Sequence, residues 1–388
     1  MRKRRIIGRR VAAGLVGVLL AGARGAGAEE PRAGMEAETR AAAEVSLRRG
    51  LDWLKTMQRE NGSWSNENFP AMTALALWGF TRSDHPDRDA ICARAAAFIE
   101  QFAQPDGGIY KPATGGRGSG GLSTYNTGIC MIALATYDRQ KYDPIIRRAR
   151  RFLAASQFRE GSSGAGGFGY EQPRPSGESG GRPMRPDLSN TSWALQAMRM
   201  TELPADVRPA DDADIDWKSA RTFVESLQCR EPTDTHNYGG FGYEPRGERG
   251  GTTVSPEGAV MLRSYGSMTY AGLESLIYAE VDRSDPRIQS ALEWAARHWS
   301  VDENPGMGLK GLFYYYTILS KSLRLAGVDE LRAPDGRVIA WKRELAAKLA
   351  ELQRPDGSWV NSDNQFWEGD PVLATSYAVL SLESVLGR

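Results

Sequence analysis

The chain has 388 residues, of which 41% are hydrophobic and 25% are charged, a composition typical of a large globular protein. Its formal net charge is +1, but seven cations lie within residues 1–28, so the remainder carries −6. This balance excludes the basic surface expected of a nucleic-acid-binding protein. The three cysteines, Cys92, Cys130 and Cys229, are widely spaced and predict neither a zinc site nor a disulfide framework.

Residues 1–28 have the pattern of a secretory signal peptide. Six arginines and lysines precede an apolar run from Val11 to Leu20, and Ala26-Gly27-Ala28 supplies small residues for cleavage. The apolar run is shorter than the roughly 18 residues that a membrane anchor requires. We therefore expect export to the periplasm or the exterior, with cleavage near Ala28 and no transmembrane segment in the mature chain. Residues 29–43 are expected to form a flexible leader.

From residue 44 to residue 388, two kinds of predicted helix alternate. The first kind carries one charged face and ends in a glutamine, as in 45–58, 91–104, 146–157, 217–228 and 340–353; in 288–299, His298 takes the approximate place of the glutamine. The second kind is apolar almost all round: 71–80, 125–137, 187–200, 268–279, 312–325 and 374–386. Because such helices must be covered by others, six hairpins predict an all-α toroid with an apolar inner ring and a polar outer ring.

The turns between the two kinds of helix repeat one phrase. A glutamine is followed by a tight glycine turn and then by an aromatic residue, as from Gln58 to Trp64 and from Gln353 to Trp359. Gln104, Gln157 and Gln228 begin degenerate copies of the phrase. Two long loops, 161–186 and 230–265, each contain the sequence Gly-Gly-Phe-Gly-Tyr-Glu, which suggests ordered aromatic caps over one end of the ring.

The phrase Gln-x-x-Asp-Gly-Ser-Trp between an outer and an inner helix resembles the QW repeats of squalene and oxidosqualene cyclases. More widely, residues 45–388 resemble the α/α toroid of terpene cyclases and of protein prenyltransferase β subunits. This resemblance implies a structural role for the repeat, in which the glutamine bonds toward the next helix and the aromatic residue stacks on it. The residues concerned are Gln58, Trp64, Gln104, Gln157, Gln228, Gln353 and Trp359.

The chain departs from the catalytic motifs of these families. It lacks the Asp-x-Asp-Asp acid of the cyclases, and the nearest string, residues 211–214, is expected to be solvated surface. The zinc phrase Asp-x-x-His-Thr of the prenyltransferases is matched from Asp187 to Thr191, except that Asn190 replaces the histidine. Asparagine is a poor zinc ligand, so neither a metal nor another cofactor is expected.

Candidate site residues come from the inner ring. Asp187 and Asp370 each precede an inner helix, where an aspartate caps the helix or, if both project into the ring, forms a carboxylate pair able to protonate or bind a ligand. The aromatic run Phe313-Tyr314-Tyr315-Tyr316 must point in several directions, so part of it is core and part could reach the lumen. The candidate ligand-binding residues are Tyr125, Asn126, Asn190, Trp193, Tyr270, Tyr315 and Tyr377.

Three functions remain open from the sequence. The first is an exported, non-catalytic toroid that binds a hydrophobic or isoprenoid-like small molecule, or a protein partner, at the mouth of the ring. The second is a divergent terpene-cyclase-like enzyme that uses Asp187 or Asp370 as its acid. The third is a glycan-active toroid with the same two carboxylates, which would have to lie about 6.5–9.5 Å apart in an inverting enzyme.

Overall fold

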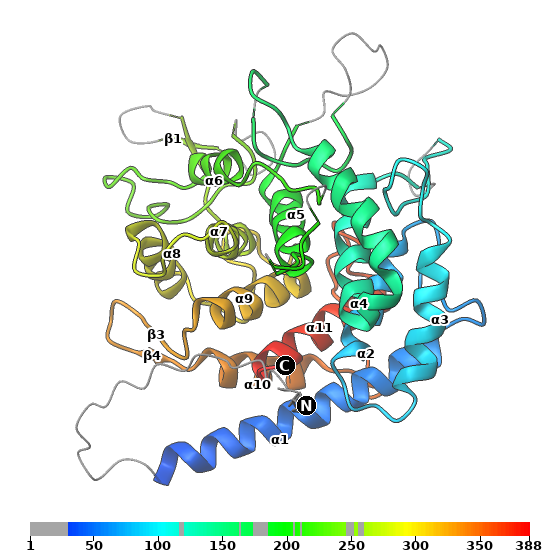
Figure 1. The fold of residues 1–388 in the computed structure, drawn as a ribbon. Helices are drawn as coiled ribbons and strands as arrows, with labels where there is room; N and C mark the ends of the chain where they lie inside the picture. The colour runs from blue at the N-terminus through cyan, green and yellow to red at the C-terminus, as the bar shows by residue number, and fades with distance from the viewer. Residues whose placement is uncertain are drawn as a thin grey trace, which may run out of the picture.

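The computed structural model describes residues 30–115, 120–162, 164–173, 185–204, 206–209, 212–245, 252–254 and 260–388. The predicted signal peptide lies outside these residues. Within them, eleven helices form two concentric rings (Figure 1). The inner ring consists of α2 (Pro70–Thr81), the first part of α4 (Ser123–Ser156), α5 (Leu188–Met200), α7 (Gly266–Tyr278), α9 (Leu312–Ala326) and α11 (Pro371–Val385).

The outer ring consists of α1 (Glu30–Met57), α3 (Arg88–Glu100), the second part of α4, α6 (Trp217–Ser226), α8 (Pro286–Arg297) and α10 (Trp341–Leu352). Each inner helix packs against the next one, and α11 packs against α2, so the inner ring is closed. In the outer ring, α1 runs beside α10 (Figure 1). The predicted all-α toroid of six hairpins is thereby confirmed.

Burial follows the two kinds of helix that the sequence predicts. Every residue of α2 is buried, because outer helices and inner neighbours cover it on all sides. By contrast, α6 buries only Ala220, Phe223 and Val224, which lie on one face. Two short antiparallel hairpins lie in the connections: β1 (Thr252–Val254) with β2 (Val260–Leu262), and β3 (Leu331–Arg332) with β4 (Val338–Ile339).

Two segments differ from the expectation. The leader expected over residues 29–43 is helical from Glu30, because α1 continues through it without interruption, and Ala43 and Leu47 are buried in the core. The second and third hairpins have no loop between them: the inner helix of the second and the outer helix of the third join in α4 across a kink at Asp138, which has φ −153° and ψ 87°. Asp138 alone leaves the helical conformation, so the chain reverses direction without a run of turn-forming residues. The sequence therefore does not mark this reversal.

The repeated glutamines bridge neighbouring hairpins. The Gln58 side-chain nitrogen donates to the carbonyl oxygens of Gly62, at 3.2 Å, and of Ile91 in α3, at 3.0 Å. Gln157, Gln228 and Gln353 make the same pair of bonds, one to the glycine of their own turn and one to the neighbouring outer helix or the residue before it. Gln104 differs, because it bonds only within its own turn, to Phe102 and Tyr110.

Trp64 and Trp359 are each tied to both helices of their hairpin, and the other glutamine turns repeat the bond to the inner helix. Trp64 donates its indole N–H to the carbonyl of Leu54 in α1 at 2.7 Å, and its backbone N–H to the Thr73 hydroxyl of α2 at 3.1 Å. Trp359 repeats this with Leu349 and Thr375. The backbone N–H groups of Ile109, Phe168 and Phe241 bond to Thr127, Thr191 and Thr269 in the same way.

Within the described part of the chain, His298 makes no bond to the next outer helix. Its ring stacks on Trp294 in its own helix, at a centroid distance of 4.2 Å, and lies against His236. The link to the next outer helix comes instead from Trp299, whose indole N–H donates to Glu344 in α10 at 2.6 Å. The turn between α8 and α9 therefore uses a different pair of side chains for the same connection.

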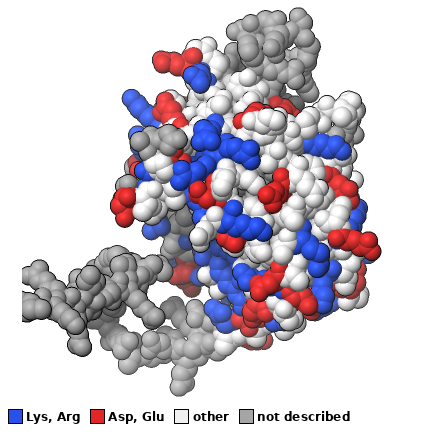
Figure 2. Space-filling model, turned by 45° about the vertical axis from the view of Figure 1, so that its right-hand side comes forward, with Lys and Arg blue, Asp and Glu red and all other residues white. Residues whose placement is uncertain are grey.

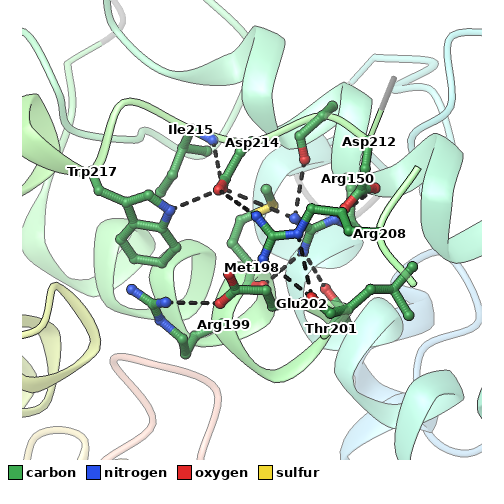
Figure 3. Close-up of polar contacts among 12 residues, drawn as sticks. Arg150, Met198, Arg199, Thr201, Glu202, Arg208, Asp212, Asp214, Ile215 and Trp217 are labelled. Atoms are coloured by element: carbon green, nitrogen blue, oxygen red, sulfur yellow. Dashed lines mark hydrogen bonds and ion pairs between the residues drawn. The ribbon is translucent and has the colours of Figure 1, made fainter. Parts of the chain in front are cut away.

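The acidic string 211–214 was expected to be solvated surface; Asp211 lies outside the described residues, but Asp212 is buried, which corrects that expectation. Figure 3 shows the contacts of Asp212 and Asp214. The Asp212 side chain is only 3% exposed and pairs at 3.4 Å with Arg150, itself 1% exposed, in the second part of α4. Arg150 also donates to the carbonyls of Met198 and Ala213. Asp214 accepts from the indole of Trp217. The polar linker around Asp212 is therefore held by a buried arginine, which the sequence of the linker does not predict.

The surface agrees with the charge balance of the sequence. On the face drawn in Figure 2, basic and acidic side chains are interspersed over the described part of the chain. Among the described residues, no helix is both long and apolar enough to cross a membrane.

Candidate functional site

A cavity of about 460 Å³ lies at the end of the ring where the inner helices begin. All six inner helices contribute residues to it from, or next to, their first turns: Ala71, Tyr125, Ser189, Met268, Tyr314 and Leu373 are one from each. The loops before α2 and α11 add Phe69 and Trp367. The volume falls in the range of small-molecule binding sites.

The lining is mainly aromatic and apolar. Nine aromatic side chains contribute, six of them tyrosines: Phe69, Tyr125, Tyr170, Tyr243, Tyr265, Tyr314, Phe366, Trp367 and Tyr377. Methionines and leucines add further apolar surface: Met72, Met268, Met307, Leu122 and Leu373. Aromatic faces and flexible methionines suit an apolar ligand whose shape is not strictly fixed.

The tyrosine hydroxyls largely satisfy one another. Tyr125 and Tyr377 share a hydrogen bond of 3.2 Å, and Tyr243 donates to Tyr170 at 3.3 Å. Tyr314 bonds to the Ser189 hydroxyl at 3.0 Å. Burial raises the pKa of the Tyr125 phenol and holds that of Tyr314 well above its ordinary value, so both stay neutral at physiological pH. The wall therefore presents ring faces and paired hydroxyls rather than reactive groups.

The first turn of every inner helix is capped by a side-chain oxygen. Backbone N–H groups at a helix start lack partners within the helix, and a capping oxygen supplies one. In α5 the cap is Asp187, which accepts from the Asn190 N–H at 2.9 Å, and in α11 it is Asp370, which accepts from the Val372 N–H at 2.8 Å. The other caps are Asn126 on α2, Glu171 on α4, Asn304 on α7 and Glu368 on α9.

Glu368 is a cavity-lining acid that the sequence analysis did not find. It is 1% exposed, and it accepts the backbone N–H groups of Phe313 and Tyr314, at 3.1 and 2.7 Å, and the Asn361 side-chain nitrogen at 2.7 Å. Burial raises the pKa of its carboxyl, against the effect of these hydrogen bonds. Because both oxygens accept from N–H donors, the geometry is that of a bound carboxylate. No repeat marks its position in the sequence.

Glu171 is a second acid near the cavity that was not predicted, although it lies in a repeated sequence. It ends the first Gly-Gly-Phe-Gly-Tyr-Glu phrase, whose aromatic residues were singled out while its acid was not. Its carboxylate accepts from the backbone and the hydroxyl of Ser123, at 3.3 and 2.8 Å. The neighbouring Tyr170 carbonyl accepts from Thr124, and in the second phrase the Tyr243 carbonyl accepts from Leu188. Both phrases therefore dock on the start of an inner helix.

The structure places only some of the residues singled out from the sequence in the cavity wall. Tyr125, Asn126 and Tyr377 line the cavity, whereas Asp187 and Asp370 cap their helices and are not among its lining residues. Asn190 donates to the Asp187 carboxylate at 2.8 Å. The remaining three are buried outside the lining: Trp193 packs against the lining residue Tyr125, and Tyr270 packs against Tyr315.

The middle of the ring is filled by a charged cluster between α2, α5, α7 and α9. The Lys321 ammonium lies 2.6 Å from the Gln196 carbonyl oxygen and 3.7 Å from Glu274, and 4.2 Å above the Trp193 ring. Burial lowers the pKa of Lys321 and raises that of Glu274. The Trp193 ring also touches Tyr125, so this cluster forms the layer directly beneath the cavity floor.

Strained backbone gathers at the cavity. Among the described residues, four other than glycine have positive φ, and two of them, Leu122 at 54° and Trp367 at 67°, line the cavity. A third, Ser65 at 53°, hydrogen-bonds to the Asp370 carboxylate. Such conformations cost of order 1–3 kcal/mol each and concentrate at functional sites.

The histidines, cysteines and acidic residues are the groups that could form a metal-binding or thiol-based site. Within the described residues, no group of three or more histidines, cysteines, aspartates and glutamates could hold a metal ion. All three cysteines are buried and unpaired, and burial raises the pKa of the Cys92 thiol to about 12. These thiols are therefore inert packing groups.

Comparison with known proteins supports the fold. No family model matches the chain, and no curated protein matches it. Among solved structures, an apo variant of the type II terpene cyclase MstE from Scytonema superposes with a TM-score of 0.55 at 13% identity, over 90% of this chain and 99% of that one. Another MstE variant, in complex with geranylgeranyl dihydroxybenzoate, gives 0.54 at 14% identity with the same coverage.

A glycosidase variant is similar to the same extent, with a TM-score of 0.53 at 14% identity over 90% of this chain and 98% of that one. The chain therefore has the α/α toroid fold that terpene cyclases share with other enzymes. Proteins of different activity share this fold at these levels of sequence identity. The structural similarity therefore does not indicate which reaction, if any, this protein catalyses.

Proposed function

We propose that this protein binds an apolar, isoprenoid-like small molecule in the cavity at the mouth of the ring and performs no chemistry on it. Support comes from the largely aromatic lining, from the volume of about 460 Å³ and from the strained residues Leu122 and Trp367 in the wall. MstE, which has the same fold, is described in complex with a geranylgeranyl compound. We further propose that the glutamine turns are QW-type repeats and that residues 1–28 direct export.

One observation carries the non-catalytic part of the proposal: the carboxylates near the cavity are used as helix caps. N–H hydrogen bonds to a capping carboxylate favour its ionised form, which opposes delivery of a proton to an alkene. Asp187 and Asp370 both cap helices and are absent from the lining. A terpene-cyclase-like reaction would require one of them to leave its helix.

The glycan-active alternative meets a related difficulty. Hydrolysis of a glycosidic bond uses two carboxylates on opposite sides of the bond. Within the described residues, Glu368 is the only carboxylate that lines the cavity, and three N–H groups bind it. These contacts favour binding over hydrolysis.

The proposal is tested by ligand binding and by blocking the cavity. Ser189 is half-buried in the lining, so Ser189→Phe should fill the cavity, whereas Thr222→Phe adds the same ring to the exposed face of α6. We expect farnesol and geranylgeraniol to quench tryptophan fluorescence and to raise the melting temperature of the wild type and of Thr222→Phe, but not of Ser189→Phe. Failure of both alcohols to bind the wild type would overturn the proposal and favour a protein partner at the mouth.

A further inference from the structure

We infer that the natural ligand is an amphiphile with one anionic head group, which Lys310 binds at the rim while the apolar body fills the cavity. This inference rests on the proposed function and specifies the ligand class. A carboxylate and a phosphate share the chemistry that a lysine ammonium recognises, so both are candidates for the head.

The polar groups of the inner wall leave little for a ligand to bond. The Asn126 amide accepts from Ala71 and donates to the carbonyls of Gly121 and Leu122. The Asn304 amide accepts from the Ser267 N–H and donates to the Ser267 hydroxyl and to the Lys310 carbonyl. Together with the hydroxyl pairs of Tyr125 with Tyr377, Tyr243 with Tyr170 and Tyr314 with Ser189, these contacts leave few polar atoms of the wall free for a ligand.

The two charged side chains of the lining differ in whether a ligand can contact them. Glu368 and Lys310 are the two charged residues that line the cavity in the described part of the chain. Glu368 is buried and its carboxylate is held by three N–H donors. Lys310 is exposed, and its ammonium has no hydrogen bond or ion pair to any described residue. The lining therefore offers a ligand one uncompensated charge, and that charge is positive.

The position of Lys310 is fixed by its backbone. Its carbonyl accepts from Asn304 at 3.1 Å, and the next residue, Gly311, adopts the left-handed conformation at φ 64° immediately before α9. On either side, Leu309 is 43% exposed and Phe366, whose ring lies near Gly311, is 50% exposed. An exposed lysine whose neighbours include exposed apolar side chains matches the boundary between the head and the tail of an amphiphile.

The head-group preference can be measured with three probes of one chain length: farnesol, farnesoic acid and farnesyl monophosphate. Their dissociation constants are compared by tryptophan fluorescence for the wild type, Lys310→Gln and Lys218→Gln. Lys218 is an exposed lysine of the outer helix α6, so its substitution removes the same charge away from the cavity. The comparison between the two acids identifies the preferred head.

We expect the wild type to bind at least one anion more tightly than farnesol. Lys310→Gln should weaken that anion about two- to five-fold, the range for a solvent-exposed ion pair, and leave farnesol unchanged. The preference should shrink as the salt concentration rises. Lys218→Gln should bind like the wild type.

Equal affinity of the wild type for farnesol and for both acids would overturn the inference while leaving the apolar cavity in place. Equal weakening by Lys218→Gln and Lys310→Gln would also overturn it, because the effect would then come from net charge. If none of the three probes binds, the proposed function fails together with it.

Discussion

Gly62 is required at its position for two separate reasons. Its φ of +88° lies in the left-handed region that L-residues avoid, and a Cβ built on it would lie 2.2 Å from the backbone oxygen of Arg94 in α3. Gly107, Gly166, Gly239 and Gly357 repeat both features against the following outer helices. The turn glycines therefore set how closely neighbouring hairpins approach.

The contact at Gly62 can be separated from its conformation by substitution. Gly336 has φ +87°, but a Cβ there would meet nothing within 4 Å. We expect Gly336→Ala to cost about 1 kcal/mol of unfolding free energy, from strain alone. Gly62→Ala should cost about 1–3 kcal/mol more, because backbone atoms must move. Urea denaturation of both variants measures the difference, and equal losses would contradict the close-contact role.

Glu383 is buried without hydrogen bonds. The side chain is fully buried in α11, and neither carboxyl oxygen has a partner among the described residues. Burial holds its pKa well above the ordinary value of 4.5, although the cations of Arg82, Arg324 and Arg388 act in the opposite direction. The folded protein therefore keeps a proton on this group that the unfolded chain releases.

The raised pKa of Glu383 makes the free energy of unfolding depend on pH. Above pH 4.5 the folded state binds more protons than the unfolded state, so the free energy of unfolding falls as the pH rises, by up to about 1.4 kcal/mol per pH unit. Glu383→Gln removes this contribution, whereas Glu293→Gln, at an exposed position of α8, should not. Urea denaturation from pH 5 to 8 measures the three slopes, and parallel slopes for wild type and Glu383→Gln would contradict the assignment.

At the scale of elements, the linker between α5 and α6 is held by the ion pair of Arg150 and Asp212. Removing one member of a buried pair leaves an uncompensated charge, at a cost of about 3–5 kcal/mol. Arg150 keeps its bonds to Met198, Thr201 and Ala213, so we expect Asp212→Asn to cost about 3 kcal/mol.

An exposed pair provides the control for that measurement. Asp89 is 91% exposed and pairs with Arg88, so Asp89→Asn should cost less than about 1 kcal/mol. Thermal and urea denaturation report both changes. A loss for Asp212→Asn no greater than that for Asp89→Asn would contradict the anchoring role of the buried pair.

The helices themselves were largely predictable, because burial imposes a period that the sequence repeats. An inner helix such as α2 is apolar on all sides, and an outer helix such as α6 is apolar on one face. The kink at Asp138 was not predictable, since one residue with non-helical dihedrals reverses the chain. The burial of Asp212 was also missed, because its partner Arg150 lies 62 positions away in a helix whose other arginines face solvent or the edge of the core.

At the scale of the whole molecule, ring closure creates the cavity. The six inner helices run in the same direction, so their first turns meet at one end. Three of the candidate residues taken from the inner helices, Tyr125, Asn126 and Tyr377, line the cavity at that end. The sequence did not identify Glu368 or Lys310, which lie in turns whose positions depend on the closed ring rather than on any repeat.

The location of ligand binding is the most direct test of the account. A diazirine-bearing isoprenoid is photocrosslinked to the protein, with and without excess geranylgeraniol, and the labelled peptides are mapped by mass spectrometry. We predict labels within 69–72, 122–126 and 365–377 that the competitor removes and that Ser189→Phe abolishes. Labels confined to the outer helices, or unaffected by the competitor, would contradict binding at the mouth of the ring.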